Sequence, residues 1–202
     1  MNPNYTLRPA DFSDQETRDL LALHLAGMHE NTPAGHVFAL DLAALTSSDI
    51  EVWTVHHHGH VAGIGALKRL SAHDGELKSM RTHPDFLRQG IASTLLDHLI
   101  HRACSLGLKK LSLETGRNSS FEPALKLYKA RGFQLGEPFA DHQASGFNQF
   151  LHLSLQNGPF PHKNTGLALP ARFSRTSLRT GFHLPDRYRV AHSHTRPYSP
   201  TY

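Results

Sequence analysis

Apolar residues along the first 156 positions follow helical and strand spacings in turn. Near the N-terminus they recur at helical intervals over about residues 14–29, as Leu20, Leu21, Leu25 and Met28. Ser13 and Glu16 have the spacing of a capping box, in which two side chains satisfy free amides at a helix start. Pro33 would end this helix, because proline has no amide hydrogen to continue it. A weaker helical pattern follows at 39–45.

Alternating and β-branched segments predict strands around two further helices. Residues 4–8 form a first short strand, and residues 50–70 form a hairpin that turns near Gly59. The other strands are expected at 75–84, 109–115, 133–139 and 148–155, the last two paired antiparallel, and the helices at 90–106 and 123–130. Simple alternation over 75–84 divides the side chains between two faces, with Leu77, Ser79 and Arg81 on one and Glu76, Lys78, Met80 and Thr82 on the other. This order of elements predicts an α/β or α+β domain built on a mixed sheet.

The charge distribution divides the chain near residue 156. Residues 157–202 contain seven lysines and arginines, one acidic residue and six prolines, and they lack apolar periodicity. The net charge of +4 therefore arises in this segment and says little about residues 1–156. We predict one compact domain over 1–156 and a basic, poorly ordered extension over 157–202. The extension lacks a pattern of stacking aromatic residues, so nucleic-acid binding is not expected.

Three features predict a cytoplasmic protein with no membrane partner. No apolar run approaches the ~18 residues that a bilayer crossing needs, and no basic-then-apolar leader follows Met1. Cys104 is the single cysteine, which excludes an internal disulfide and suits a reducing compartment. The histidines over 56–60 alternate between strand faces, so no metal site is expected there.

The segment with the clearest candidate chemistry is Met80 to Leu99. It is predicted as a strand, a tight loop and the start of a helix, with Gly90 and Ala92 at the entry. The first amides of a helix have no partner within the helix, and the helix dipole adds partial positive charge. Small residues let a ligand approach these amides. A phosphate group is the ligand that such a place suits.

This segment, HPDFLRQGIASTLLDHLI over 83–100, resembles the pyrophosphate loop of the GNAT superfamily of N-acetyltransferases. LYKARGF over 127–133 resembles a later signature of the same superfamily, a tyrosine-bearing helix followed by Gly-Phe. The two segments stand in the expected order with a strand between them, and the resemblance covers residues 5–155. A narrower likeness is to a bacterial stand-alone subgroup of acetyltransferases. Two positions depart from the pattern: Leu87 where glutamine or arginine is usual, and Phe121 where an asparagine is frequent.

The resemblance implies a mostly antiparallel central sheet with flanking helices and a splayed pair of central strands. It also implies acetyl-CoA as the co-substrate. Backbone groups near Met80, Arg81 and Thr82 would contact its pantetheine. The pyrophosphate would be wrapped by the loop and helix start, at Arg88, Gln89, Gly90, Ile91, Ala92 and Ser93. Dimers are frequent in the superfamily, so a homodimer is one expected assembly.

Transfer to an amine needs a deprotonated nucleophile and a proton for the leaving thiolate. Tyr128 matches the tyrosine of the family and would supply that proton. Glu76 is the first candidate for the base and Glu114 the second, because a carboxylate is unusual in a strand; a water chain is a third solution. Among the substrate contacts we expect His29, near the end of the first helix, together with Glu114.

The expected activity is direct acetyl transfer to the amine of a small molecule within a ternary complex. Two other functions fit the sequence. The departure at Phe121 and the basic extension fit a non-catalytic module that binds or senses acyl-CoA. A protein acetyltransferase would prefer peptides to small amines.

Overall fold

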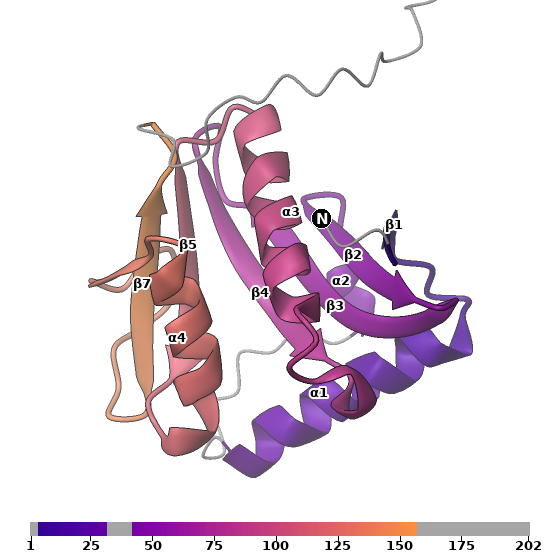
Figure 1. Ribbon diagram of the computed structural model, residues 1–202. Helices are drawn as coiled ribbons and strands as arrows, with labels where there is room; N and C mark the ends of the chain where they lie inside the picture. Colours follow the sequence, from indigo (N-terminus) through magenta and orange to yellow (C-terminus); the bar gives the residue numbers. More distant parts are fainter. Residues whose placement is uncertain (1–3, 32–41, 157–202) are drawn as a thin grey trace, which may run out of the picture. The chain divides into compact units, whose positions relative to one another are not determined.

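A computed structural model describes residues 4–31 and 42–156 of the chain, and the extension over 157–202 lies outside them. Seven strands form one sheet, in the order β1-β2-β3-β4-β5-β7-β6 (Figure 1). Their bounds are β1 Tyr5–Pro9, β2 Ile50–His57, β3 His60–Arg69, β4 Asp74–Thr82, β5 Lys110–Gly116, β6 Gln134–Gly136 and β7 Asn148–Ser154. All neighbours are antiparallel except β4 and β5, which are parallel. The predicted mixed, mostly antiparallel sheet is confirmed.

Helices cover both faces of this sheet. Their bounds are α1 Gln15–Asn31, α2 Leu42–Leu45, α3 Ile91–Ser105 and α4 Glu122–Ala130, with short 3-10 turns η1 Pro84–Phe86 and η2 Ser119–Phe121. On β3, Ile64 and Ala66 pack with leucines of α1. A Cβ added to Gly65, between them, would meet Leu95 and Leu99 of α3. Since adjacent strand residues point to opposite faces, α1 and α3 lie on opposite sides of β3.

The two central strands separate along their length. β4 and β5 pair only through Asp74–Lys110, Gly75–Leu111 and Glu76–Ser112. Beyond this point β4 continues to Thr82 and β5 to Gly116 without pairing with each other, and their ribbons diverge in Figure 1. The splayed pair expected from the resemblance is therefore present, and Glu76 lies where it begins.

A bulge in β4 overturns the simple alternation predicted for this strand. The register against β3 shifts between Ile64 and Ala66, and Ser79 has a positive φ of 53°. Lys78 pairs with Ala66 and Arg81 with Ile64, both of which face α1. Arg81 therefore lies on the same face as Lys78, because the extra residue in the bulge reverses the alternation after it.

The start of α1 also differs from the prediction. Asp14 caps the helix, since its Oδ2 accepts a hydrogen bond from the Thr17 amide at 3.2 Å. Glu16 does not complete a capping box with Ser13; its Oε2 accepts a hydrogen bond from the Val61 amide at 2.8 Å. Glu16 therefore stabilises the contact between α1 and β3 and does not cap its own helix. In the described residues, none of the helices has the length and apolar character that a membrane span requires.

Candidate active site

A cavity of about 120 Å³ lies where β4 and β5 diverge. His24 and Met28 of α1 contribute one wall, and Ala124 and Tyr128 of α4 contribute another. Those helices lie on different faces of the sheet, because Tyr128 packs in the same core cluster as α3. The cavity is therefore lined from both faces of the sheet, and it passes from one face to the other through the gap between β4 and β5.

The loop before α3 leaves the helix start open to a ligand. Gly90 is the N-cap residue, with φ 86° and no side chain to bond to the first amides. A Cβ added there would meet no protein atom within 4 Å. The amides of Ile91, Ala92 and Ser93 precede the first residue that can bond back along the helix, Thr94, whose amide donates to the Gly90 carbonyl. This open cradle fits a pyrophosphate group.

The rest of this loop is held by its own contacts. Arg88 has a positive φ of 59° and is exposed. The Tyr5 hydroxyl donates to the Gln89 carbonyl, which ties the loop to β1. His83 caps η1, where its Nδ1 accepts from the Asp85 amide at 3.3 Å. The loop therefore has a fixed shape while its outer edge faces solvent.

The three residues predicted at the end of β4 point to different places. Met80 lines the cavity and packs near α3. Arg81 lies on the other face, with its guanidinium close to Gly27 of α1. Thr82 pairs with Gly63 of β3. Of the three, Met80 alone has a side chain in the lining of the cavity.

Tyr128 is buried on α4, with only 6% of its surface exposed. Its ring makes an edge contact with Phe133, at a centroid distance of 5.8 Å. Burial raises the pKa of the phenol well above its ordinary value. The described residues offer the hydroxyl no hydrogen-bond partner. A protonated phenol therefore faces the cavity.

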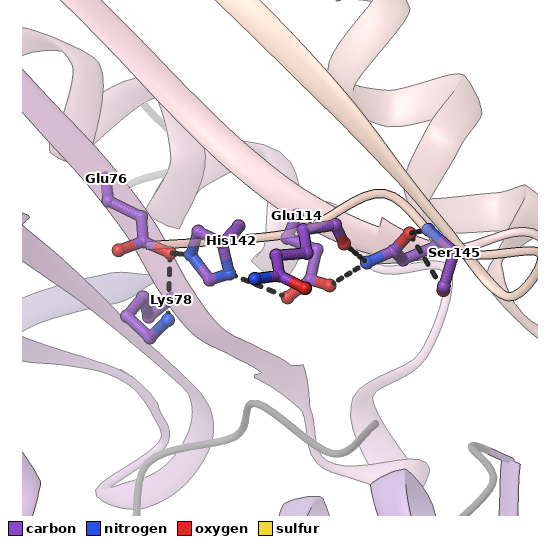
Figure 2. Close-up of polar contacts among 7 residues, drawn as sticks. Glu76, Lys78, Glu114, His142 and Ser145 are labelled. Atoms are coloured by element: carbon purple, nitrogen blue, oxygen red, sulfur yellow. Dashed lines mark hydrogen bonds and ion pairs between the residues drawn. The ribbon is translucent and has the colours of Figure 1, made fainter. Parts of the chain in front are cut away.

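A chain of polar side chains crosses the gap between the strands (Figure 2). Glu76 Oε1 accepts hydrogen bonds from Lys78 Nζ and from His142 Nε2, both at 2.8 Å. On the other side of the imidazole, His142 Nδ1 lies 3.4 Å from Glu114 Oε2. Asn148 Nδ2 donates to Glu114 Oε1 at 2.6 Å. The two glutamates predicted from the sequence are thus brought together by a histidine.

The neighbouring side chains in this row of polar contacts change the pKa of Glu76. Burial alone would raise the pKa of its carboxyl group, but the hydrogen bond from His142 and the charge of Lys78 outweigh burial and leave the pKa below its ordinary value. Its side chain is only 3% exposed. Glu76 is therefore an ionised carboxylate held by two partners.

One histidine of α1 lines the cavity, and it is not the one expected from the sequence. His24 is buried and lines the cavity; burial and the nearby charge of Arg81 lower its pKa to about 4. His29 is exposed near the end of α1 and is absent from the lining formed by the described residues. Helical spacing explains the difference. Residues 24 and 28 are four positions apart and lie on the same face of α1, whereas residue 29 lies on another face.

Sequence reasoning missed His142 and Asn148, which hold the two glutamates. Both lie outside any periodic segment or at its edge: His142 is in the connection between β6 and β7, and Asn148 is the first residue of β7. Asn148 Oδ1 accepts from the amide and hydroxyl of Ser145, at 2.8 and 3.0 Å. No spacing in the sequence marks these contacts.

Phe121, the second departure from the family pattern, packs on β5. A Cβ added to Gly116 would lie 2.3 Å from its ring, so the aromatic side chain occupies the space over this glycine. Phe121 also lines the cavity. Within residues 4–31 and 42–156, no group of three histidine, cysteine, aspartate or glutamate residues is placed to hold a metal ion.

Comparison with known proteins gives relatives of one kind. The chain is 39% identical over 158 residues to YedL, an uncharacterized N-acetyltransferase of Escherichia coli (strain K12), covering 78% of this chain and 99% of that protein. It is 43% identical over 132 residues to YsnE, an uncharacterized N-acetyltransferase of Bacillus subtilis (strain 168), covering 65% and 87%. A GNAT family acetyltransferase from Elizabethkingia anophelis, solved with acetyl-CoA bound, has the same fold, with a TM-score of 0.57, 22% identity and coverage of 76% and 100%.

The sequence model of the acetyltransferase (GNAT) family matches residues 10–133. This stretch contains the loop before α3. It also contains the splayed strands and Tyr128, which line the cavity described above. The chain therefore belongs to the GNAT family, whose members are acetyl-CoA-dependent acyltransferases.

Proposed function

We propose that this enzyme transfers the acetyl group of acetyl-CoA directly to the amine of a small molecule, with both substrates bound at once. The observation that carries this proposal is the cavity between β4 and β5, which is lined by Tyr128 from α4 and by Glu76 and Glu114 from the two strands. Acyl transfer to an amine requires a base for the amine and a proton donor for the leaving thiolate, and this space has a carboxylate and a phenol for those two tasks.

Acetyl-CoA would bind from the side of α3 and α4. The free amides of Ile91, Ala92 and Ser93, with Gln89 and Gly90 before them, would hold the pyrophosphate. Arg88 is exposed beside them and can add a charge-assisted hydrogen bond. The backbone of Met80, Arg81 and Thr82, next to the splay, would meet the pantetheine. When bound, acetyl-CoA supplies the activated thioester.

Two side chains would handle the protons. Glu114 is the better base, because Glu76 Oε1 already accepts two hydrogen bonds from groups that can carry positive charge. Glu114 Oε1 accepts from a neutral amide, and its Oε2 has only the longer contact with His142. Tyr128 would donate a proton to the leaving sulfur and recover one from the acceptor nitrogen.

A small acceptor fits the size of the site. A cavity of about 120 Å³ with walls from His24, Met28 and Phe147 leaves room for a compact amine. His29, which the sequence suggested as a contact, would touch only the outer part of an acceptor. The single cysteine supports action in a reducing compartment such as the cytoplasm.

The test is a thiol-release assay on the purified full chain with acetyl-CoA and a panel of small amines and peptides. We expect turnover with small amines and, in initial-rate plots against both substrates, lines that intersect. Parallel lines would contradict direct transfer. Binding of acetyl-CoA without turnover would favour the non-catalytic module, and preference for peptides would favour a protein acetyltransferase.

A further inference from the structure

His142 contacts both carboxylates that line the cavity, although it is not itself part of the lining (Figure 2). Its Nε2 lies 2.8 Å from Glu76 Oε1 and its Nδ1 lies 3.4 Å from Glu114 Oε2. The His142 and Glu114 side chains are each 10% exposed, and that of Glu76 is 3% exposed. The imidazole therefore lies behind the two acids, where water has little access.

The geometry sets the charge of the imidazole. Each ring nitrogen faces a carboxylate oxygen, which can only accept a hydrogen bond. Only the imidazolium form has a hydrogen on both nitrogens, whereas a neutral ring would turn one lone pair toward a carboxylate. Together with Lys78, an imidazolium gives two cations for two anions, which is the balance that buried charges need.

Other described groups lie around His142. The ring of Phe139 contacts it at a centroid distance of 4.9 Å and also contacts His152 of β7 at 5.7 Å. Phe150 of β7 lies on another side at 6.1 Å. Among residues 4–31 and 42–156, the titratable and charged groups recorded near it are Glu76 and Lys78 from β4, Glu114 from β5 and, across Phe139, His152 from β7. His24 of α1 lines the same cavity as the two glutamates.

On the basis of the function proposed above, we propose that His142 is a positioning residue for acceptor deprotonation, which holds Glu114 ionised and directed at the cavity. Glu114 then takes a proton from the acceptor ammonium. The freed nitrogen lone pair forms the bond to the acetyl carbon, the carbon–sulfur bond breaks, and its electron pair stays on sulfur. Tyr128 protonates the sulfur and recovers a proton from the nitrogen, and Glu114 releases its own proton to water.

The main test is the pH dependence of kcat/KM for the acceptor in His142→Gln. Glutamine can still donate to Glu76 but has no charge. A carboxylate that loses a neighbouring cation takes up its proton at a higher pH, so the acidic limb should move up by about one pH unit while the KM for acetyl-CoA stays unchanged. A structural role alone would lower activity at all pH values without moving this limb.

The matched control is His152→Gln. His152 contacts the same Phe139 but bonds to Ser112 Oγ and the Glu137 carbonyl instead of the two acids. Its acidic limb should stay at the wild-type pH. An equal movement in both variants would overturn the proposal, because it would reflect repacking around Phe139.

Glu76→Gln provides a second, independent test if His142→Gln does not fold. Removing this negative charge leaves Lys78 and His142 beside Glu114, so the acidic limb of the activity that remains should move to lower pH. Abolished turnover in Glu76→Gln with retained turnover in Glu114→Gln would overturn the proposal, as would an active His142→Gln with an unmoved limb. A wild-type enzyme that binds acetyl-CoA without turnover would overturn the proposed function itself, whereas an unmoved limb in an active His142→Gln would overturn only the role of His142.

Discussion

Burial raises the pKa of the Tyr128 phenol well above its ordinary value, so the hydroxyl keeps its proton near neutral pH. A leaving thiolate is a weaker base than a phenolate, so in the proposed reaction the proton moves to sulfur only as the phenolate recovers one from the acceptor nitrogen. The aromatic ring packs against Phe133 in the core, and Tyr128 also lines the cavity. One side chain thus has two separable roles.

The first prediction separates these roles with Tyr128→Phe. The ring and its packing remain, so the protein should fold as stably as the wild type, while kcat should fall by about 10²-fold because general acid catalysis is lost. Steady-state kinetics with both substrates would measure this. The KM for acetyl-CoA should not change.

Tyr5→Phe is the matched control, since it removes a hydroxyl that donates to the Gln89 carbonyl at the phosphate loop. It should raise the KM for acetyl-CoA and leave kcat nearly intact. Equal kcat in Tyr128→Phe and wild type would show that the sulfur takes its proton from elsewhere.

Single residues were predictable where a motif or an element identified them. Tyr128 lies in a helix with a recognisable sequence, and Glu76 and Glu114 stand out as carboxylates in segments that read as strands. His142 could not be found in this way, because its role depends on a connection that brings it between two strands. Contacts between segments 28 and 66 residues apart leave no periodic trace in the sequence.

At the scale of elements, hydrophobic periodicity located the helices and strands, and the details of their ends came from tertiary contacts. The hairpin of β2 and β3 turns at Gly59 as predicted. The bulge at Ser79 was not predictable, because no residue type in GELKSMRT requires it. The spacing of Glu16 predicted a capping box, but its carboxylate accepts a hydrogen bond from the Val61 amide of β3 instead.

The second prediction concerns the start of α3. Gly90→Ala forces a side chain into a left-handed backbone conformation, which should cost about 1 kcal/mol of folding free energy. The new methyl group would also stand in the open cradle, so acetyl-CoA should bind at least about tenfold more weakly. Isothermal titration calorimetry and chemical unfolding would measure the two effects.

Gly107→Ala is its control at the other end of the same helix. Gly107 also has a positive φ, 77°, and open space around it, but it is far along the helix from the phosphate loop. It should lose similar stability and keep its affinity for acetyl-CoA. Equal losses of affinity in both variants would mean that helix strain, and not the cradle, explains the effect at Gly90.

The third prediction concerns the contact between β5 and η2. Gly116→Ala would place a methyl group inside the space of the Phe121 ring, and it should destabilise the protein by about 1–3 kcal/mol. The cost should fall when Phe121 is replaced by alanine, with a coupling of about 1 kcal/mol in a double-mutant cycle. Additive losses would contradict the contact.

At the scale of the whole molecule, the stability of the fold is linked to pH through His24. The folded pKa of about 4 is below the ordinary value of 6.5, so between these values the unfolded chain binds the proton and the folded protein does not. Stability is therefore complete above pH 6.5 and decreases as the pH falls toward 4. For Glu76 the corresponding loss begins lower, below the ordinary carboxyl value of 4.5.

The fourth prediction follows because His24 and Glu76 lose their contributions to stability in different pH ranges. Between pH 7 and pH 5, His24 should account for a loss of about 2 kcal/mol in unfolding free energy. His24→Gln should remove this part of the pH dependence, as measured by urea unfolding at the two pH values. The exposed His29→Gln is the control and should retain the wild-type dependence; a His24→Gln protein that also retains it would contradict the neutral, buried state of His24.

The cavity that passes through the sheet has a consequence for how the enzyme can diversify. The phosphate loop and the end of the strand before it form one stretch, residues 80–93, whereas other walls of the cavity come from α1 and from Phe147 and Asn148. Exchange of these walls between homologous enzymes would create chimeras with new acceptor preferences and an inherited coenzyme affinity. Gene duplicates could then diverge in what they acetylate through substitutions in two short stretches of the chain.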